Sequence, residues 1–132
     1  MTAPGLLDTS VLIALGDGVD FDVLPDRVAI SAVTAAELAA APHLASDPGE
    51  RAVRQVRLQQ VTAAFEPIAL DADAAMSYGM VATAVVQAGR MPQRRLADLL
   101  IAATAHAHGL DVYTRNPDDF AGLDALIRVV AV

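Results

Sequence analysis

The stretch LLDTSVLIAL at residues 6–15 decides how the first part of the chain folds. Its apolar start predicts a short strand over residues 6–8, and residues 9–15 predict a helix. Asp8 stands where the two elements meet, among aliphatic side chains. A carboxylate in such surroundings is costly unless it is hydrogen-bonded, paired or bound to a cation. Asp8 therefore either caps the helix or belongs to a functional site, and taken alone it favours neither.

Further acids occur in similar surroundings, although the chain is 55% hydrophobic and only 19% charged. They are Glu37 in the stretch VTAAELA, Asp98 in RLADLLI, and Asp118 and Asp119 in NPDDF. A chain with so few charged residues has little reason to place carboxylates among aliphatic neighbours. Several acids placed in this way indicate a shared cation-binding site.

Each of these acids also has a purely structural explanation. Glu37 follows Thr34 at the spacing of a capping box, which would place both residues at the start of a helix. Asp98 is expected inside a helix, where the arginines at residues 94–95 could pair with it. Residues 116–119 have the pattern of a helix cap, a proline and an acidic first turn. These explanations stay open for each acid alone.

Length and composition narrow the class of protein. The 132 residues predict a single domain, residues 1–132, that is large enough to bury a core. No apolar run reaches membrane-spanning length and no signal peptide is recognisable, so we expect a cytoplasmic location. The absence of cysteine excludes disulfides, thiolate zinc sites and a cysteine nucleophile. The net charge of −7 argues against bulk electrostatic binding of nucleic acid, although the basic residues, all arginines, could still hold phosphate.

Apolar runs and helical patterns alternate along the chain. Strands are predicted over residues 6–8, 27–31, 67–70, 111–114 and 127–132. Helices are predicted over residues 9–15, 35–41, 48–65, 72–88 and 94–108, with a glycine turn at residues 16–18 after the first. This alternation predicts a parallel sheet covered by helices on both faces. Ligands bind such sheets at the carboxyl ends of the strands, which is where Asp8 and Asn116 fall.

The order of these motifs resembles the PIN-domain ribonucleases, and most closely the VapC-type toxins of bacterial toxin–antitoxin pairs. The resemblance covers essentially the whole chain. It rests on the opening LDTSVLIAL at residues 7–15, the closing YTRNPDDF at residues 113–120, and the two acids between them. It implies an α/β fold, a three-layer α/β/α sandwich around a short parallel sheet. It also implies a Mg²⁺-dependent endoribonuclease, the toxin of a type II system, that cleaves RNA phosphodiesters with metal-activated water.

The resemblance assigns roles to the three acids that stand in the family's order. Asp8 and Asp98 would be the principal metal ligands. Glu37 would be the third acid, acting on the metal directly or through water. Oxygen ligands without any cysteine favour Mg²⁺, for which Mn²⁺ can substitute, over zinc.

The fourth acidic position departs from the family pattern. Asn116 stands where many PIN domains carry an aspartate, so it would be a neutral oxygen ligand of the metal. Asp119 could supply the missing charge as the fourth catalytic acid, with Asp118 as the alternative. The hydroxyl groups expected near the metal are those of Thr9, Ser10 and Thr114.

Partners follow partly from charge and partly from the resemblance. Because the acids repel RNA, Arg94, Arg95 and Arg115 are expected to contact its phosphates near the site. The resemblance implies a homodimer, and a VapB-type antitoxin whose extended C-terminal segment covers the active site. The RNA target and the number of metal ions stay open.

Two other functions are compatible with parts of the sequence. A phosphoryl-transfer enzyme with Asp8 as covalent nucleophile would want a second aspartate where the chain has Ser10, and a lysine, which the chain lacks. A catalytically degraded PIN-fold module that only binds partners is favoured by Asn116. Since Asp8, Glu37 and Asp98 are all present, the ribonuclease is the favoured function.

Overall fold

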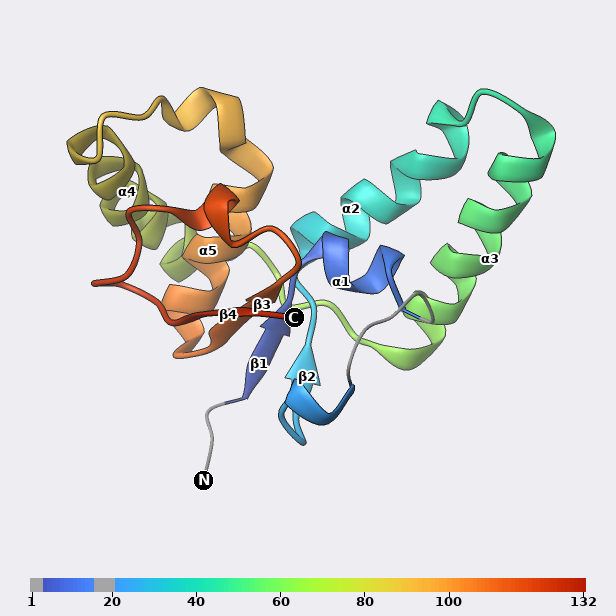
Figure 1. Cartoon of the computed structure of the whole chain (residues 1–132), viewed down its shortest axis with the longest axis horizontal. Helices are drawn as coiled ribbons and strands as arrows, with labels where there is room; N and C mark the ends of the chain where they lie inside the picture. Colours follow the sequence, from blue (N-terminus) through green and yellow to red (C-terminus); the bar gives the residue numbers. More distant parts are fainter. Residues whose placement is uncertain (1–3, 16–20) are drawn as a thin grey trace.

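A four-stranded parallel sheet forms the centre of the molecule (Figure 1). The computed structural model describes residues 4–15 and 21–132, so the turn predicted at residues 16–18 lies outside the described residues. The strands are β1 (Gly5–Leu7), β2 (Val28–Ala29), β3 (Asp111–Thr114) and β4 (Val129–Ala131). Their order is β2-β1-β3-β4, so β1 and β3 are paired neighbours despite their separation in sequence.

Helices alternate with the strands, as the sequence pattern predicts. The α-helices are α1 (Thr9–Ile13), α2 (Ala32–Ala40), α3 (Pro48–Ala64), α4 (Ala72–Gln87) and α5 (Leu96–His108). Short 3-10 turns are η1 (Phe21–Val23), η2 (Ala41–Leu44), η3 (Pro92–Arg95) and η4 (Pro117–Phe120). In the described part of the chain, no helix is both long enough and apolar enough to cross a membrane.

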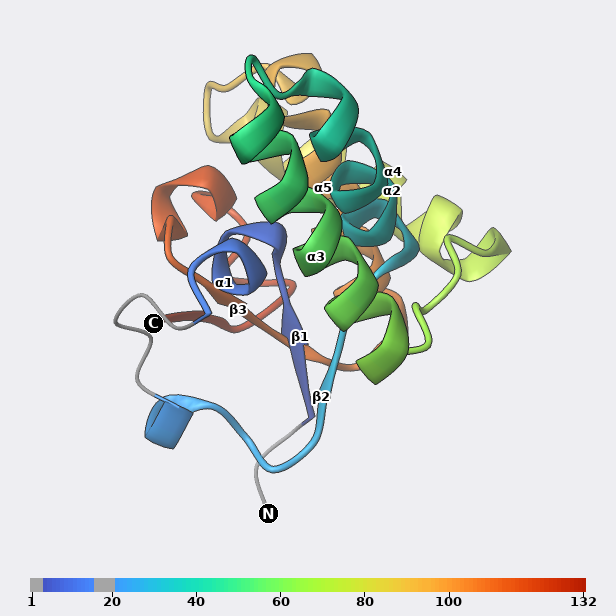
Figure 2. The same cartoon turned by 90° about the vertical axis from the view of Figure 1, so that its right-hand side faces the viewer.

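Successive strand residues point to opposite faces of the sheet, and this separates two hydrophobic cores. Leu6 and Val112 face one core, which contains buried side chains of α4 and α5. Leu7 and Tyr113 face the other core, which includes residues of α1, α2 and α3. The sheet therefore lies between two helical layers, and the predicted three-layer α/β/α sandwich is confirmed (Figure 2).

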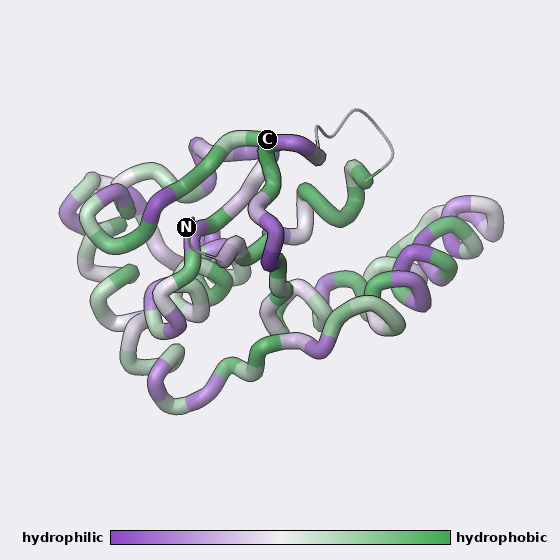
Figure 3. Tube along the Cα trace, turned by 90° about the horizontal axis from the view of Figure 1, so that it is seen from below, coloured by the Kyte–Doolittle hydropathy of each residue, from purple (hydrophilic) through white to green (hydrophobic). Residues whose placement is uncertain are grey.

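Helices α2 and α3, joined by η2, form an arm that extends from the sheet on the side away from α4 and α5 (Figure 1). The arm alternates between hydrophilic and hydrophobic segments along its length (Figure 3). Of the 17 residues of α3, only Val61 is buried. The sheet-proximal part of the arm thus joins the second core, while most of α3 faces outward.

Several predicted helix ends are confirmed because they depend on local chemistry. The carboxylates of Asp47 and Asp71 accept backbone N–H groups at the starts of α3 and α4. Gly109 ends α5 in the left-handed conformation, with φ of +66°, which a glycine adopts without a steric penalty.

One predicted strand is missing from the described residues, and two predicted helix starts differ from the observed ones. The strand predicted over residues 67–70 is reduced to one bridge, between Ser31 and Ile68, because Pro67 has no N–H to donate and its later residues are exposed. Helix α2 begins at Ala32, three residues earlier than predicted, because the Ser31 hydroxyl caps it. Helix α5 begins at Leu96 because residues 92–95 form η3 instead.

Candidate active site

Asp8 lies directly after β1 and both caps α1 and enters a polar network. Its side chain is only 4% exposed. Its Oδ1 atom accepts the backbone N–H of Ser10 at 3.0 Å and that of Val11 at 3.4 Å. The Ser10 hydroxyl donates to the same oxygen, and the Thr114 hydroxyl donates to Oδ2 at 2.7 Å. These hydrogen bonds offset the cost of burying the carboxylate and fix its orientation.

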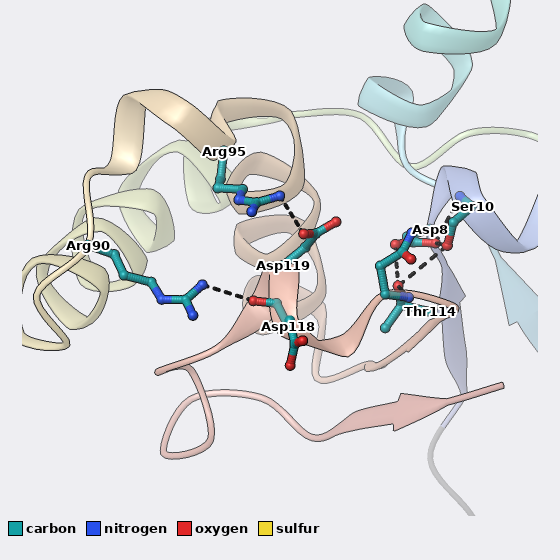
Figure 4. Close-up of polar contacts among 8 residues, drawn as sticks. Asp8, Ser10, Arg90, Arg95, Thr114, Asp118 and Asp119 are labelled. Atoms are coloured by element: carbon teal, nitrogen blue, oxygen red, sulfur yellow. Dashed lines mark hydrogen bonds and ion pairs between the residues drawn. The ribbon is translucent and has the colours of Figure 1, made fainter.

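The same network joins the carboxyl ends of β1 and β3, which are paired in the sheet. The Ser10 Oγ atom accepts the backbone N–H of Arg115 at 3.0 Å. The Thr114 Oγ1 atom accepts the backbone N–H of Asn116 at 2.9 Å. Figure 4 shows Asp8, Ser10 and Thr114 drawn together at this edge. The two motifs that frame the sequence therefore meet through side chain-to-backbone hydrogen bonds.

Glu37 lies in the middle of α2, at the same edge of the sheet. Its Oε1 atom accepts a hydrogen bond from the Thr9 hydroxyl at 2.6 Å, and the Thr9 and Thr34 hydroxyls are 3.2 Å apart. The capping-box explanation of Glu37 is wrong, because the cap is Ser31 and Thr34 is already inside the helix. Glu37 is held instead by the first turn of α1.

Asp98 lies in the first turn of α5 and not in the helix interior, since α5 begins at Leu96. Burial raises the pKa of its carboxyl from the ordinary value of 3.8 to about 6, with further contributions from the negative charges of Asp119, Asp8 and Glu37. The positive charge of Arg95 acts in the opposite direction. Acids from three other segments of the chain are thus close enough to Asp98 for their charges to act on it.

Asp119 and Asp118 have different surroundings although they are neighbours in η4. The Asp119 carboxylate forms an ion pair with the Arg95 guanidinium. The Asp118 side chain points away from that pair (Figure 4), and its backbone carbonyl accepts a hydrogen bond from Arg90 Nη1 at 3.0 Å. Asp119 is therefore the member of the pair that joins the other acids. The helical pairing of Arg95 with Asp98 is replaced by this pairing with Asp119.

The remaining predicted residues lie at the surface around the acids. Asn116, Arg94 and Arg115 are exposed. Within the described residues, the Asn116 side chain makes no capping hydrogen bond, although the residue precedes η4. Arg90 is not among the arginines predicted to contact RNA; its contact with the Asp118 carbonyl spans 28 residues and therefore has no signature in local spacing.

The donor set fits a hard divalent cation, although the side chains do not enclose one. Among the described residues, no group of three or more His, Cys, Asp or Glu side chains is arranged to hold a metal ion. Mg²⁺ keeps several of its waters and commonly uses only one or two protein carboxylates. Burial raises the pKa of the Asp98 carboxyl most, and a bound cation would relieve the further contribution from the neighbouring acids. By its chemistry, the set of oxygen donors therefore fits a hard divalent cation.

Comparisons with known proteins agree with this geometry. Residues 5–126 match the family described as the PIN domain. Ribonuclease VapC5 of Mycobacterium tuberculosis is 40% identical over 129 residues, covering 96% of this chain and 93% of that protein. Ribonuclease VapC4 of the same organism is 35% identical over 119 residues, covering 86% of each chain.

A solved structure leads to the same family. It is described as a member of the VapBC family of toxin-antitoxin systems, VapBC-5, from Mycobacterium tuberculosis. It superimposes with a TM-score of 0.88 at 38% identity, covering 99% of this chain and 100% of that one. The resemblance noted in the sequence is thereby confirmed. This chain belongs to the PIN-domain family and, within it, to the VapC-type proteins.

Proposed function

We propose that this protein is a metal-dependent endoribonuclease and the toxin of a type II toxin–antitoxin system. The observation that carries the proposal is the convergence of Asp8, Glu37, Asp98 and Asp119 at the carboxyl edge of the sheet. Two relatives with 40% and 35% identity are named as ribonucleases, which supports the same activity here. All-oxygen ligands beside arginines suit a reaction on a phosphodiester.

Asp8 and Asp98 would hold Mg²⁺, or Mn²⁺ in its place. Glu37 and Asp119 would add negative charge around the cation, and the Asn116 side chain would offer a neutral oxygen. When bound, the cation would neutralise charge that develops on the phosphodiester and make a water molecule more acidic. The hydroxyls of the chain prepare this site. Ser10 and Thr114 orient Asp8, while Thr9 orients Glu37.

RNA contacts are assigned to the arginines around the acids. Arg94 and Arg115 are exposed beside the site and are free to reach a phosphate oxygen. Arg95 is also half-exposed, but it already contacts Asp119. A guanidinium suits this task because its planar donors match the oxygens of a phosphate.

The partners follow from the relatives. The structure at 38% identity is described as a member of the VapBC family, and we infer that a VapB-type antitoxin neutralises this chain by covering the acids. We also infer a homodimer and a cytoplasmic site of action, where RNA and antitoxin are both present. Residues 1–132 would act as one domain, since both cores are built on one sheet.

A degraded, purely partner-binding module is the weaker alternative. Its one argument was the neutral residue Asn116 at a position where an acid is expected. The carboxylate of Asp119, three residues later, is close enough to Asp98 for their charges to repel. A fourth acid is therefore available at the site, which favours the enzyme.

The test uses the purified chain, freed of any co-purifying partner, with total RNA and Mg²⁺ or Mn²⁺. An Asp98→Asn variant and a sample with EDTA are run alongside. Discrete cleavage that disappears in both controls would support the proposal and identify the substrate. Repeated absence of cleavage, together with no metal binding by calorimetry, would contradict the proposal and favour the partner-binding module.

A further inference from the structure

A basic hollow lies beside the acids, on the turn that connects α4 to α5. It has a volume of about 450 Å³ and is lined by Gly89, Arg90, Met91, Arg94 and Arg95. Three of the nine basic residues of an acidic chain are thus gathered within six positions. Such a concentration of guanidinium groups attracts a strong anion, and phosphate is the anion that the proposed substrate carries.

Two of these arginines reach across to η4, the segment that carries Asp119. Arg90 donates to the Asp118 carbonyl at 3.0 Å, and Arg95 forms its ion pair with the Asp119 carboxylate (Figure 4). Arg94 makes no ion pair among the described residues. The basic turn therefore both adjoins the acids and keeps one guanidinium available for a ligand.

The ion pair between Arg95 and Asp119 connects the basic turn to the acids of the candidate site. Among the contacts between acidic and basic side chains in the described part of the chain, it alone involves one of the four acids of the candidate site. The Arg95 side chain is 46% exposed and that of Asp119 is 25% exposed. Because water and solutes reach this pair, a second anion can compete for the same guanidinium.

We infer that the turn at residues 89–95 binds a backbone phosphate of the RNA strand, and that this phosphate shares Arg95 with Asp119. Binding of the phosphate draws Arg95 away from the carboxylate. Asp119 is then left for the metal cation, which replaces the guanidinium as its counter-charge. This inference rests on the proposed ribonuclease function and extends it from the acids to how the substrate is held.

A thermodynamic consequence follows for the two ligands. Because RNA releases an acid that the cation needs, RNA binding strengthens metal binding, and metal binding strengthens RNA binding by the same factor. Before RNA binds, the guanidinium of Arg95 neutralises the charge of the Asp119 carboxylate. The full negative charge of the acids therefore becomes available to a cation only when the substrate is present.

Three variants separate the parts of this inference. Arg95→Gln removes the shared charge, Arg95→Lys keeps it, and Arg94→Gln is the matched control that removes a charge not paired with an acid. Mn²⁺ affinity is measured by calorimetry without nucleic acid. Affinity for a fluorescein-labelled single-stranded RNA is measured by anisotropy in EDTA over a series of salt concentrations. Circular dichroism verifies that each variant is folded.

We expect Arg95→Gln to bind Mn²⁺ about 5-fold more tightly, whereas Arg95→Lys and Arg94→Gln stay close to wild type. Both glutamine variants should bind RNA more weakly, with a salt dependence shallower by about 0.7 in the slope of log K on log salt. Unchanged or weaker Mn²⁺ binding by Arg95→Gln would overturn the shared role of Arg95. An RNA affinity and salt slope unchanged in both glutamine variants would overturn the phosphate site.

The proposed function can fail separately from this inference. If the wild-type chain neither binds nor cleaves RNA, the proposed ribonuclease function is refuted, and the phosphate site loses its basis. If the wild-type chain cleaves RNA but the Arg95 and Arg94 variants bind Mn²⁺ and RNA as the wild type does, only the phosphate site is refuted.

Discussion

The two halves of the acidic site are held in different ways. Asp8 is buried, and its two oxygens accept hydrogen bonds from two hydroxyls and two backbone N–H groups. Asp119 is partly exposed and its carboxylate is held by the guanidinium of Arg95. The first half is part of the sheet edge, whereas the second depends on a surface ion pair that solvent and ligands can reach. A rigid half and an exchangeable half therefore share one site.

The largest effect is expected in the rigid half. Asp8→Asn should lower RNA cleavage by about 1,000-fold, because losing a carboxylate proposed to hold the cation would remove several kcal/mol of transition-state stabilisation. Asp111→Asn is the matched control, since Asp111 lies at the opposite end of β3 and pairs with Arg128. Both variants are compared in a cleavage assay with Mg²⁺. Retention of more than a tenth of the activity in Asp8→Asn would contradict the assignment.

Asp98 is affected by the charges of both Asp8 and Asp119, and its carboxyl makes the stability of the protein depend on pH. Its pKa is raised in the fold to about 6, so the folded state holds a proton that the unfolded state releases near pH 4. The free energy of unfolding of the metal-free protein should therefore fall as pH rises from about 4 to about 6, by about 1 kcal/mol because solvent screens a carboxyl that is only partly buried. Asp98→Asn should remove this decrease, as measured by urea denaturation at several pH values. The same pH profile in the variant and the wild type would refute the prediction.

The adjacent pair in η4 tests the exchangeable half. Asp119→Asn should lower cleavage by between about 10- and 100-fold, the range typical of residues that support a metal site. Asp118→Asn should change it little, because that side chain points away from the Arg95–Asp119 pair. The two variants are measured in parallel with RNA at saturation. Equal losses in both would mean that η4 as a whole, rather than the Asp119 carboxylate, is needed.

The smallest effects compare two threonine hydroxyls. Thr114→Val leaves the buried Oδ2 atom of Asp8 without its donor and removes the acceptor of the Asn116 backbone N–H, and should cost about 2 kcal/mol of stability. Thr9→Val removes a hydrogen bond to the exposed Glu37 and should cost less than about 1 kcal/mol. Thermal denaturation of both variants measures the difference. A larger loss for Thr9→Val than for Thr114→Val would contradict this order.

Much of the fold could be predicted because it depends on neighbours in the chain. The strand at residues 111–114 and the caps at Asp47, Asp71 and Gly109 were expected and are observed. Each rests on an apolar run, a carboxylate before a helix or a glycine after one. Such signals act over a few residues, so they can be read directly from the sequence.

The start of α2 could not be predicted in the same way. Ser31 is at once the cap of the helix and the residue that bridges to Ile68. That bridge joins positions 37 residues apart, and with Ser31 as the cap the helix begins at Ala32 instead of the predicted residue 35. As a result Glu37 changes from a candidate cap to a side chain held by Thr9.

The acids of the site were identified by residue type and by their position at the ends of strands and on apolar helices. The choice between Asp118 and Asp119 was not, because two adjacent carboxylates look alike until the backbone of η4 directs one of them to Arg95. Neither the contact of Arg90 with η4 nor the raised pKa of Asp98 has a local signature.

By itself, the sequence determined the alternation of strands and helices, the chemistry of the ligands and the edge of the sheet where they would lie. These properties follow from periodicity and from residue type, which need no knowledge of distant contacts. Tertiary structure decided which charged side chains lie close together and which guanidinium pairs with Asp119. Electrostatic interaction depends on distance and burial, and both are set only when segments far apart in the chain come together.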